Sequence, residues 1–216
     1  ICDLNEGYAI YRPRYILPDY NVYIKKGCEF LELPAPKNLD EALDGLLILY
    51  SHVPSITTFP VYIGRLDMLL DPFITDEEQD YIKIKRFLNH VDKTVPDSFC
   101  HANIGPYDTK AGRLILKAVI ELEAPTPNMT IRYDKSKTSR EFAELAAKAC
   151  LLVSKPSFAN DAYYISDLGE QYGIASCYNA LPECGGAYTL TRLRLGTIAR
   201  ACKTVDEMVN ELLPRV

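Results

Sequence analysis

The sequence has no tryptophan, only three histidines, and no two cysteines in a C-x-x-C spacing. Its seven cysteines are scattered singly, and no histidine stands at a ligand spacing from any of them. Structural zinc sites draw their ligands from closely spaced pairs, and disulfide frameworks use even sets of cysteines. We therefore expect no metal site, and reduced thiols in a cytoplasmic protein.

Other absences narrow the function further. The formal net charge is −5, with no basic cluster of the kind that binds nucleic acid or anionic lipid. The longest apolar runs, such as Leu46–Tyr50, are far too short to cross a bilayer. No glycine-rich phosphate loop is present, which argues against a nucleotide cofactor. We expect neither nucleic acid nor membrane as a partner.

The remaining composition is that of a globular protein, with 48% apolar and 25% charged residues over 216 positions. Short β-prone runs at 98–104, 129–133 and 173–177 alternate with longer helical patterns, which predicts an α/β fold with the strands inside. The predicted helices cover 39–50, 76–90, 109–123, 139–153 and 205–213. Their expected N-caps are Asn38, Thr75, Asp108, Thr138 and Thr204.

Cys177 stands out among the seven cysteines. It ends the strand-like segment Gly173–Ser176 and precedes polar, turn-forming residues, so we expect it at the tip of a loop on a rigid strand. By itself, a single cysteine is more often a small buried apolar residue than a catalyst. A nucleophilic cysteine assembled in space with His101 also stays open.

Several segments resemble the glycyl radical enzymes, and more closely the YjjI-type glycine radical enzymes. In that superfamily an arginine-bearing strand, a helix, an asparagine-aspartate loop and a cysteine loop follow one another in this order. The corresponding segments here are 127–134 (PNMTIRYD), 138–142 (TSREF), 154–161 (SKPSFAND) and 172–179 (YGIASCYN). The likeness extends to 11–20, 52–55, 60–64, 101–106 and 185–190 and so covers almost the whole chain.

The resemblance implies a barrel of strands surrounded by helices, built from two half-barrels, in which a cysteine loop meets a glycine loop. An activating enzyme that uses S-adenosylmethionine and an iron–sulfur cluster would generate a glycyl radical. Cys177 would pass its hydrogen atom to that glycine and then act, as a thiyl radical, on a small polar metabolite in anaerobic metabolism. A homodimer is one candidate assembly.

Departures from the superfamily pattern also shape these expectations. No arginine-valine-x-glycine-tyrosine type segment occurs before Val216, so we expect residues 1–216 to be a single partial domain, an interior fragment that cannot form its own radical. The position two residues after the cysteine, a glutamate base in the dehydratases, is Asn179, and a neutral amide cannot take a proton. Ser176 also precedes Cys177, where pyruvate formate-lyase has a second cysteine.

The candidate substrate-binding residues are Tyr178, Asn179, His101, Asn103, Arg132 and Asn160. For three of them an alternative stays open. His101 either faces the substrate or is satisfied by hydrogen bonds in the core, and Arg132 either binds a carboxylate or phosphate or pairs with a nearby acid. Asn160, with Asp161, either lines the pocket or forms a turn.

Two other function classes remain as alternatives. One is a non-catalytic truncated protein or partner subunit, whose incomplete barrel exposes strand edges that favour association. The other is an ordinary cysteine nucleophile, which fast alkylation of Cys177 at neutral pH would indicate.

Overall fold

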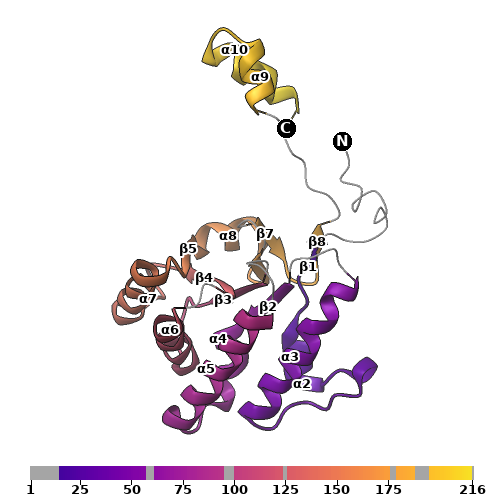
Figure 1. Cartoon of the computed structure of the whole chain (residues 1–216), viewed down its shortest axis with the longest axis vertical. Helices are drawn as coiled ribbons and strands as arrows, with labels where there is room; N and C mark the ends of the chain where they lie inside the picture. Colours follow the sequence, from indigo (N-terminus) through magenta and orange to yellow (C-terminus); the bar gives the residue numbers. More distant parts are fainter. Residues whose placement is uncertain are drawn as a thin grey trace.

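A computed structural model describes residues 15–56, 61–94, 100–123, 126–175, 179–187 and 195–215 (Figure 1). The strands are β1 (Tyr15–Ile16), β2 (Val61–Arg65), β3 (Cys100–Ile104), β4 (Asn128–Tyr133), β5 (Ser157–Asn160), β6 (Tyr172–Ala175), β7 (Asn179–Pro182) and β8 (Gly186–Ala187). The α-helices are α2 (Tyr20–Lys26), α3 (Leu39–Ile56), α4 (Leu66–Leu70), α5 (Glu77–Thr94), α6 (Lys110–Leu122), α7 (Arg140–Val153), α8 (Asp161–Leu168), α9 (Leu195–Ala201) and α10 (Val205–Leu212).

Four strands form one parallel sheet in the order β2-β3-β4-β5. Parallel neighbours need crossover connections, and here helices supply them. The predicted α/β class with internal strands is therefore confirmed. The sheet is open among the described residues, so they do not themselves close a barrel.

One face of this sheet is apolar and carries the main core. The inward side chains of β2, β3 and β4 pack there against α3, α5, α6 and α7, and Figure 1 shows these helices along one side of the strands. Because side chains alternate along a strand, every second residue belongs to this face. The strand residues in the core are Val61, Ile63, Cys100, Ala102, Ile104, Met129 and Ile131.

The opposite face of the same strands is buried but polar. It carries Tyr62, His101, Asn103, Thr130 and Arg132, all shielded from solvent. Parallel sheets usually bury apolar faces under helices on both sides. Here the antiparallel pair β6–β7 packs against the second face. Its strand β6 contacts both β2 and β3.

The predicted helices are all present, with small shifts at their starts. Asn38 and Thr204 cap α3 and α10 as expected. The other three caps lie one residue further along, at Asp76, Thr109 and Ser139. Two of the expected caps have other partners: Thr138 accepts a hydrogen bond from the Asp134 amide, and Asp108 binds Arg113 and Ser139.

Helices α9 and α10 lie away from the sheet in Figure 1. Of the helices in the described ranges, none combines the length and the apolarity that crossing a membrane requires.

Gly45, in the middle of α3, gives a test of this packing. An added Cβ would lie 1.7 Å from the Tyr23 hydroxyl oxygen, which donates a hydrogen bond to the Glu41 carbonyl. We expect Gly45→Ala to lower the free energy of unfolding by about 1–3 kcal/mol, measured by chemical denaturation. Gly196→Ala in α9, whose new Cβ meets nothing within 4 Å, is the control and should have little effect. Equal effects of the two substitutions would contradict the packing described.

Candidate functional site

The β6–β7 pair is the element that carries the candidate cysteine. Its register runs from Tyr172 opposite Pro182 to Ala175 opposite Asn179. The chain passes from β6 to β7 through Ser176, Cys177 and Tyr178, which lie outside the described residues. The predicted strand before the cysteine is confirmed over 172–175, while the placement of Cys177 and Tyr178 stays a prediction.

Asn103 binds the backbone of β6 with both ends of its amide. Its Nδ2 donates to the Ile174 carbonyl at 2.9 Å, and its Oδ1 accepts from the Ile174 N–H at 2.7 Å. The Asn103 side chain is fully buried, so these two bonds satisfy groups that would otherwise be desolvated without partners. The Asn103 amide thus holds the strand before Cys177, and its predicted contact with a substrate stays a prediction.

Arg132 binds the same strand closer to its start. Its Nη1 donates to the Tyr172 carbonyl at 3.2 Å and its Nη2 to the Glu170 carbonyl at 3.3 Å. Its Nε pairs with Asp161 Oδ1 at 2.7 Å, and its guanidinium lies 3.8 Å from the centre of the Tyr172 ring. Of the two roles open for Arg132, the described contacts match pairing with a nearby acid.

Asp161 connects this arginine to the tyrosine on β6. Its Oδ1 also accepts a hydrogen bond from the Tyr172 hydroxyl at 2.8 Å, and Lys137 Nζ lies 3.6 Å from its Oδ2. Burial, together with the neighbouring Asp161 carboxylate, raises the pKa of Tyr172, so its hydroxyl stays protonated and donates. The sequence drew attention to Asp161 only as a neighbour of Asn160.

Tyr62 on β2 and Glu183, which follows β7, form a second contact between the sheet and the β6–β7 pair. The buried Tyr62 hydroxyl lies 3.3 Å from Glu183 Oε1 and 3.5 Å from Asn103 Oδ1. Burial raises the pKa of Tyr62 well above its ordinary value and also raises that of the Glu183 carboxyl. Tyr62 lies in segment 60–64 of the family resemblance, but no motif pointed to its contact with Glu183, because the two residues are 121 positions apart.

His101 lies on the same polar face as Asn103, two residues earlier in β3. It is only 4% exposed, and no described residue offers its Nε2 a hydrogen-bond partner. Burial, with a contribution from the Lys155 charge, lowers its pKa to about 4, so the imidazole is neutral at physiological pH. A neutral imidazole with an unsatisfied nitrogen can donate or accept one further hydrogen bond.

A cavity of about 420 Å³ opens beside β6, over β4, β5 and α8. Thr130, Ser157 and Asn160 line it with uncharged polar groups. Ile174 forms the wall next to the β6–β7 pair. The other lining residues are Phe158, Ala159, Tyr163 and Tyr164. Asn160 both lines this cavity and caps α8, since its Oδ1 accepts from the Tyr163 amide. Asn179 is exposed at the start of β7, opposite Ala175.

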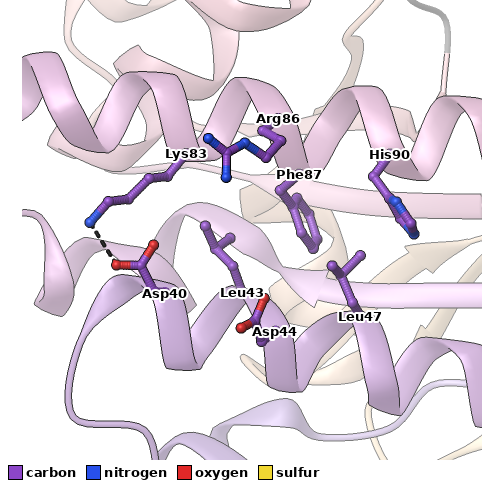
Figure 2. Close-up of a pocket in the computed structure, with 8 residues that line it drawn as sticks. All are labelled: Asp40, Leu43, Asp44, Leu47, Lys83, Arg86, Phe87 and His90. Atoms are coloured by element: carbon purple, nitrogen blue, oxygen red, sulfur yellow. Dashed lines mark ion pairs between the residues drawn. The ribbon is translucent and has the colours of Figure 1, made fainter.

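A second, smaller hollow lies in the helical layer, between α3 and α5 (Figure 2). Leu43, Leu47 and Phe87 line it, and the Lys83–Asp40 ion pair, 2.8 Å long, spans one end. These helices cover the apolar face of the sheet, so this hollow is separate from the polar face that holds β6. No cluster of three metal-ligating side chains occurs within the ranges that the structure describes.

Comparison with known proteins places this chain in a class, the glycyl radical enzymes. The family model for the YjjI-like glycyl radical enzymes matches residues 1–216. The chain therefore belongs to the YjjI-like family of glycyl radical enzymes, as the resemblance of its motifs predicted.

Two curated relatives are similar to all or nearly all of the chain. The chain is 92% identical over 216 residues to an uncharacterised protein of Haemophilus influenzae (strain ATCC 51907 / DSM 11121 / KW20 / Rd). It is 46% identical over 217 residues to the uncharacterised protein YjjI of Escherichia coli (strain K12). All or nearly all of the chain is matched in each case, and the match spans 42% of each relative's length.

Gly173 tests how closely β6 approaches the sheet. A Cβ at this position would lie 2.4 Å from the Tyr62 hydroxyl oxygen and 2.8 Å from Leu17 Cδ2. We expect Gly173→Ala to push β6 away from β2 and to lower the free energy of unfolding by about 1–3 kcal/mol. Differential scanning calorimetry of the complete polypeptide measures the change. Tyr62→Phe combined with Gly173→Ala should restore part of the loss, and an unchanged melting temperature for Gly173→Ala alone would contradict the close approach.

The buried His101 predicts a pH dependence of stability. Its folded pKa of about 4 lies below its ordinary 6.5, so the unfolded chain binds more protons between these values. The contribution of neutral His101 is therefore complete above pH 6.5 and is lost as the pH falls toward 4. The stability difference between wild type and His101→Gln should shrink by about 1–3 kcal/mol over this window, measured by denaturation at several pH values.

The stability of wild type must be compared with that of His101→Gln, because Asp67 changes the stability with pH in the opposite direction to His101. Burial raises the pKa of Asp67 to about 6 from 3.8, so the folded protein binds more protons between these values and stability falls as pH rises there. Both proteins share the contribution of Asp67, so it cancels when the free energy of unfolding of His101→Gln is subtracted from that of wild type. A difference that does not vary with pH would contradict a buried, neutral His101.

Proposed function

We propose that the complete polypeptide is a glycyl radical enzyme in which Cys177 is the hydrogen-abstracting residue. The observation that carries the proposal is the attachment of β6 to the polar sheet face. Asn103 and Arg132 fix its backbone at Ile174, Tyr172 and Glu170, directly before the segment that contains Cys177. A reacting group needs a rigid support of this kind.

In this proposal Cys177 undergoes two hydrogen-atom transfers. Its S–H bond breaks as the hydrogen atom moves to the glycyl radical, which leaves a closed-shell glycine and a thiyl radical on Cys177. The thiyl then takes a hydrogen atom from a substrate C–H bond, restoring the thiol and leaving the unpaired electron on the substrate carbon. Glycine Cα–H and thiol S–H bonds have similar strengths, so the first transfer has little energetic cost.

The glycyl radical supplies the stored unpaired electron and would come from a segment outside this chain. Within the described residues the fit of such a group is supported by the sheet itself. In the described residues, α3, α5, α6 and α7 pack on the apolar face, while the other face is polar and holds β6–β7, as expected of one half-barrel whose interior is completed by further chain. A closed interior of this kind would keep solvent and oxygen from a radical.

The cavity beside Ile174 is the proposed place for the substrate, which we take to be a small polar metabolite. Its described polar lining consists of hydroxyl and amide groups. Asn160 reaches it directly, and His101, Asn179 and Tyr178 are proposed to complete it from β3 and from the segment around Cys177. The neutral His101 would orient a substrate oxygen by a hydrogen bond without carrying charge.

The proposed partners follow from the family. A cytoplasmic activating enzyme with an iron–sulfur cluster and S-adenosylmethionine would install the glycyl radical under anaerobic conditions. A homodimer is proposed as the assembly, in line with the expectation from the resemblance.

Replacing the thiol tests the proposed function without knowledge of the substrate. Reversible transfer between Cys177 and the glycyl radical would exchange the glycine α-hydrogen with solvent, since thiol hydrogens exchange freely with water. In D2O the electron paramagnetic resonance doublet of the activated wild-type enzyme should therefore collapse to a singlet. Cys177→Ser should still form the radical but keep the doublet, because the glycyl radical cannot take a hydrogen atom from the stronger O–H bond of serine.

Cys184→Ser is the matched control, since Cys184 is exposed and lies at the far end of the β6–β7 pair. It should exchange like the wild type. Collapse of the doublet in Cys177→Ser at the wild-type rate would contradict the assignment of Cys177.

A further inference from the structure

We propose that Asn103 and Arg132 are positioning residues, which hold β6 at one register so that Cys177 meets the glycyl radical. This inference rests on the proposed function of Cys177. It assigns to both residues a role other than contact with the substrate. Their tests therefore concern radical transfer and not substrate affinity.

The residues that the two side chains bind show how the register is held. Arg132 binds the carbonyls of Glu170 and Tyr172, and Asn103 binds the N–H and carbonyl of Ile174. These residues are spaced by two, and the peptide groups of alternate residues in an extended strand point to the same edge. One edge of β6 is paired with β7, and Asn103 and Arg132 take the place of a neighbouring strand along the other.

A slip of β6 by one residue would break this arrangement. The peptide groups at Gly173 and Ala175 point to the opposite edge, so they could not replace those of Tyr172 and Ile174. Both Asn103 and Arg132 are almost completely buried, and a slipped strand would leave an amide and a guanidinium without their acceptors. The bonds therefore select one position of β6 along the sheet as well as holding it.

Asp161 and Tyr172 keep Arg132 in the orientation in which it can bind the backbone carbonyls of Glu170 and Tyr172. Asp161 binds the Arg132 Nε and the Tyr172 hydroxyl, and the Tyr172 ring lies against the guanidinium. Nη1 and Nη2 are then left for the two carbonyls of the chain entering β6. Lysine at position 132 could keep the pairing with Asp161 but has no planar fork to reach both carbonyls.

Asn103→Ala and Arg132→Lys, in the complete polypeptide after activation, test the proposal. The glycyl radical should form to the wild-type level, because in the proposed function the activating enzyme installs it without the Cys177 thiol. The collapse of the doublet in D2O should slow by on the order of 100-fold, the effect expected when reacting atoms are misplaced by about 1 Å. Wild-type collapse rates in both variants would overturn the proposal.

Asn38→Ala is the matched control. It removes an asparagine amide that caps α3, away from β6, and so destabilises the protein without touching the strand. Its collapse rate should equal that of wild type. A slowing as large as in Asn103→Ala would show that general loss of stability, not positioning, causes the effect.

Hydrogen exchange at one backbone amide tests the attachment even if a variant fails to fold. In the wild-type polypeptide the Ile174 N–H is bonded to Asn103 Oδ1, so we expect slow exchange, and fast exchange would overturn the proposal. The two hypotheses also fail differently. An absent collapse in wild type would refute the role of Cys177, whereas a normal collapse in the variants would refute positioning alone.

Discussion

A buried arginine requires an anion and several acceptors, and the position of β6 depends on how Arg132 meets this requirement. Asp161 supplies the anion, and the carbonyls of Glu170 and Tyr172 accept the remaining bonds. Leaving one partner out would strand a desolvated charge, which is far more costly than losing an exposed ion pair. The polar sheet face thus gives β6 one position, and Asn103 repeats the same kind of bond at Ile174.

The two faces of the sheet have different roles: one stabilises the fold, and the other carries the proposed site. The apolar face packs against α3, α5, α6 and α7 and supplies most of the buried hydrophobic surface. The other face buries polar groups, which stabilise a structure only when they are paired. Most of them are paired through β6–β7, and His101 Nε2 is left without a partner among the described residues. A face of this composition is suited to hold a reacting segment and a small polar molecule.

Much of this organisation could be predicted from the sequence. Capping residues and hydrophobic periodicity gave the five long helices, and β-prone runs gave β3, β4 and β6. The family could be recognised because several independent motifs occur in the expected order. Two strands of the parallel sheet, β2 and β5, were not predicted, although Pro60–Gly64 and 154–161 were part of the resemblance.

The contacts of the candidate site were harder to predict, for physical reasons. Asn103 and Arg132 were predicted to bind a substrate, which stays a prediction, and the partners that the structure gives them include backbone groups about 40–70 residues away in sequence. Backbone acceptors leave no mark in a sequence, so a bound carboxylate was as reasonable a partner for Arg132 as Asp161. The contact between the Tyr62 and Glu183 side chains carried no local signal, because the two residues are 121 positions apart in sequence.

The most direct test of the account is an anaerobic crystal or cryo-electron microscopy structure of the complete polypeptide. The account predicts that Cys177 Sγ points to the polar side of the β2–β5 sheet and lies in van der Waals contact, about 4 Å, with the glycine that carries the radical. A structure in which Cys177 faces solvent, or in which that glycine approaches another part of the chain, would contradict it.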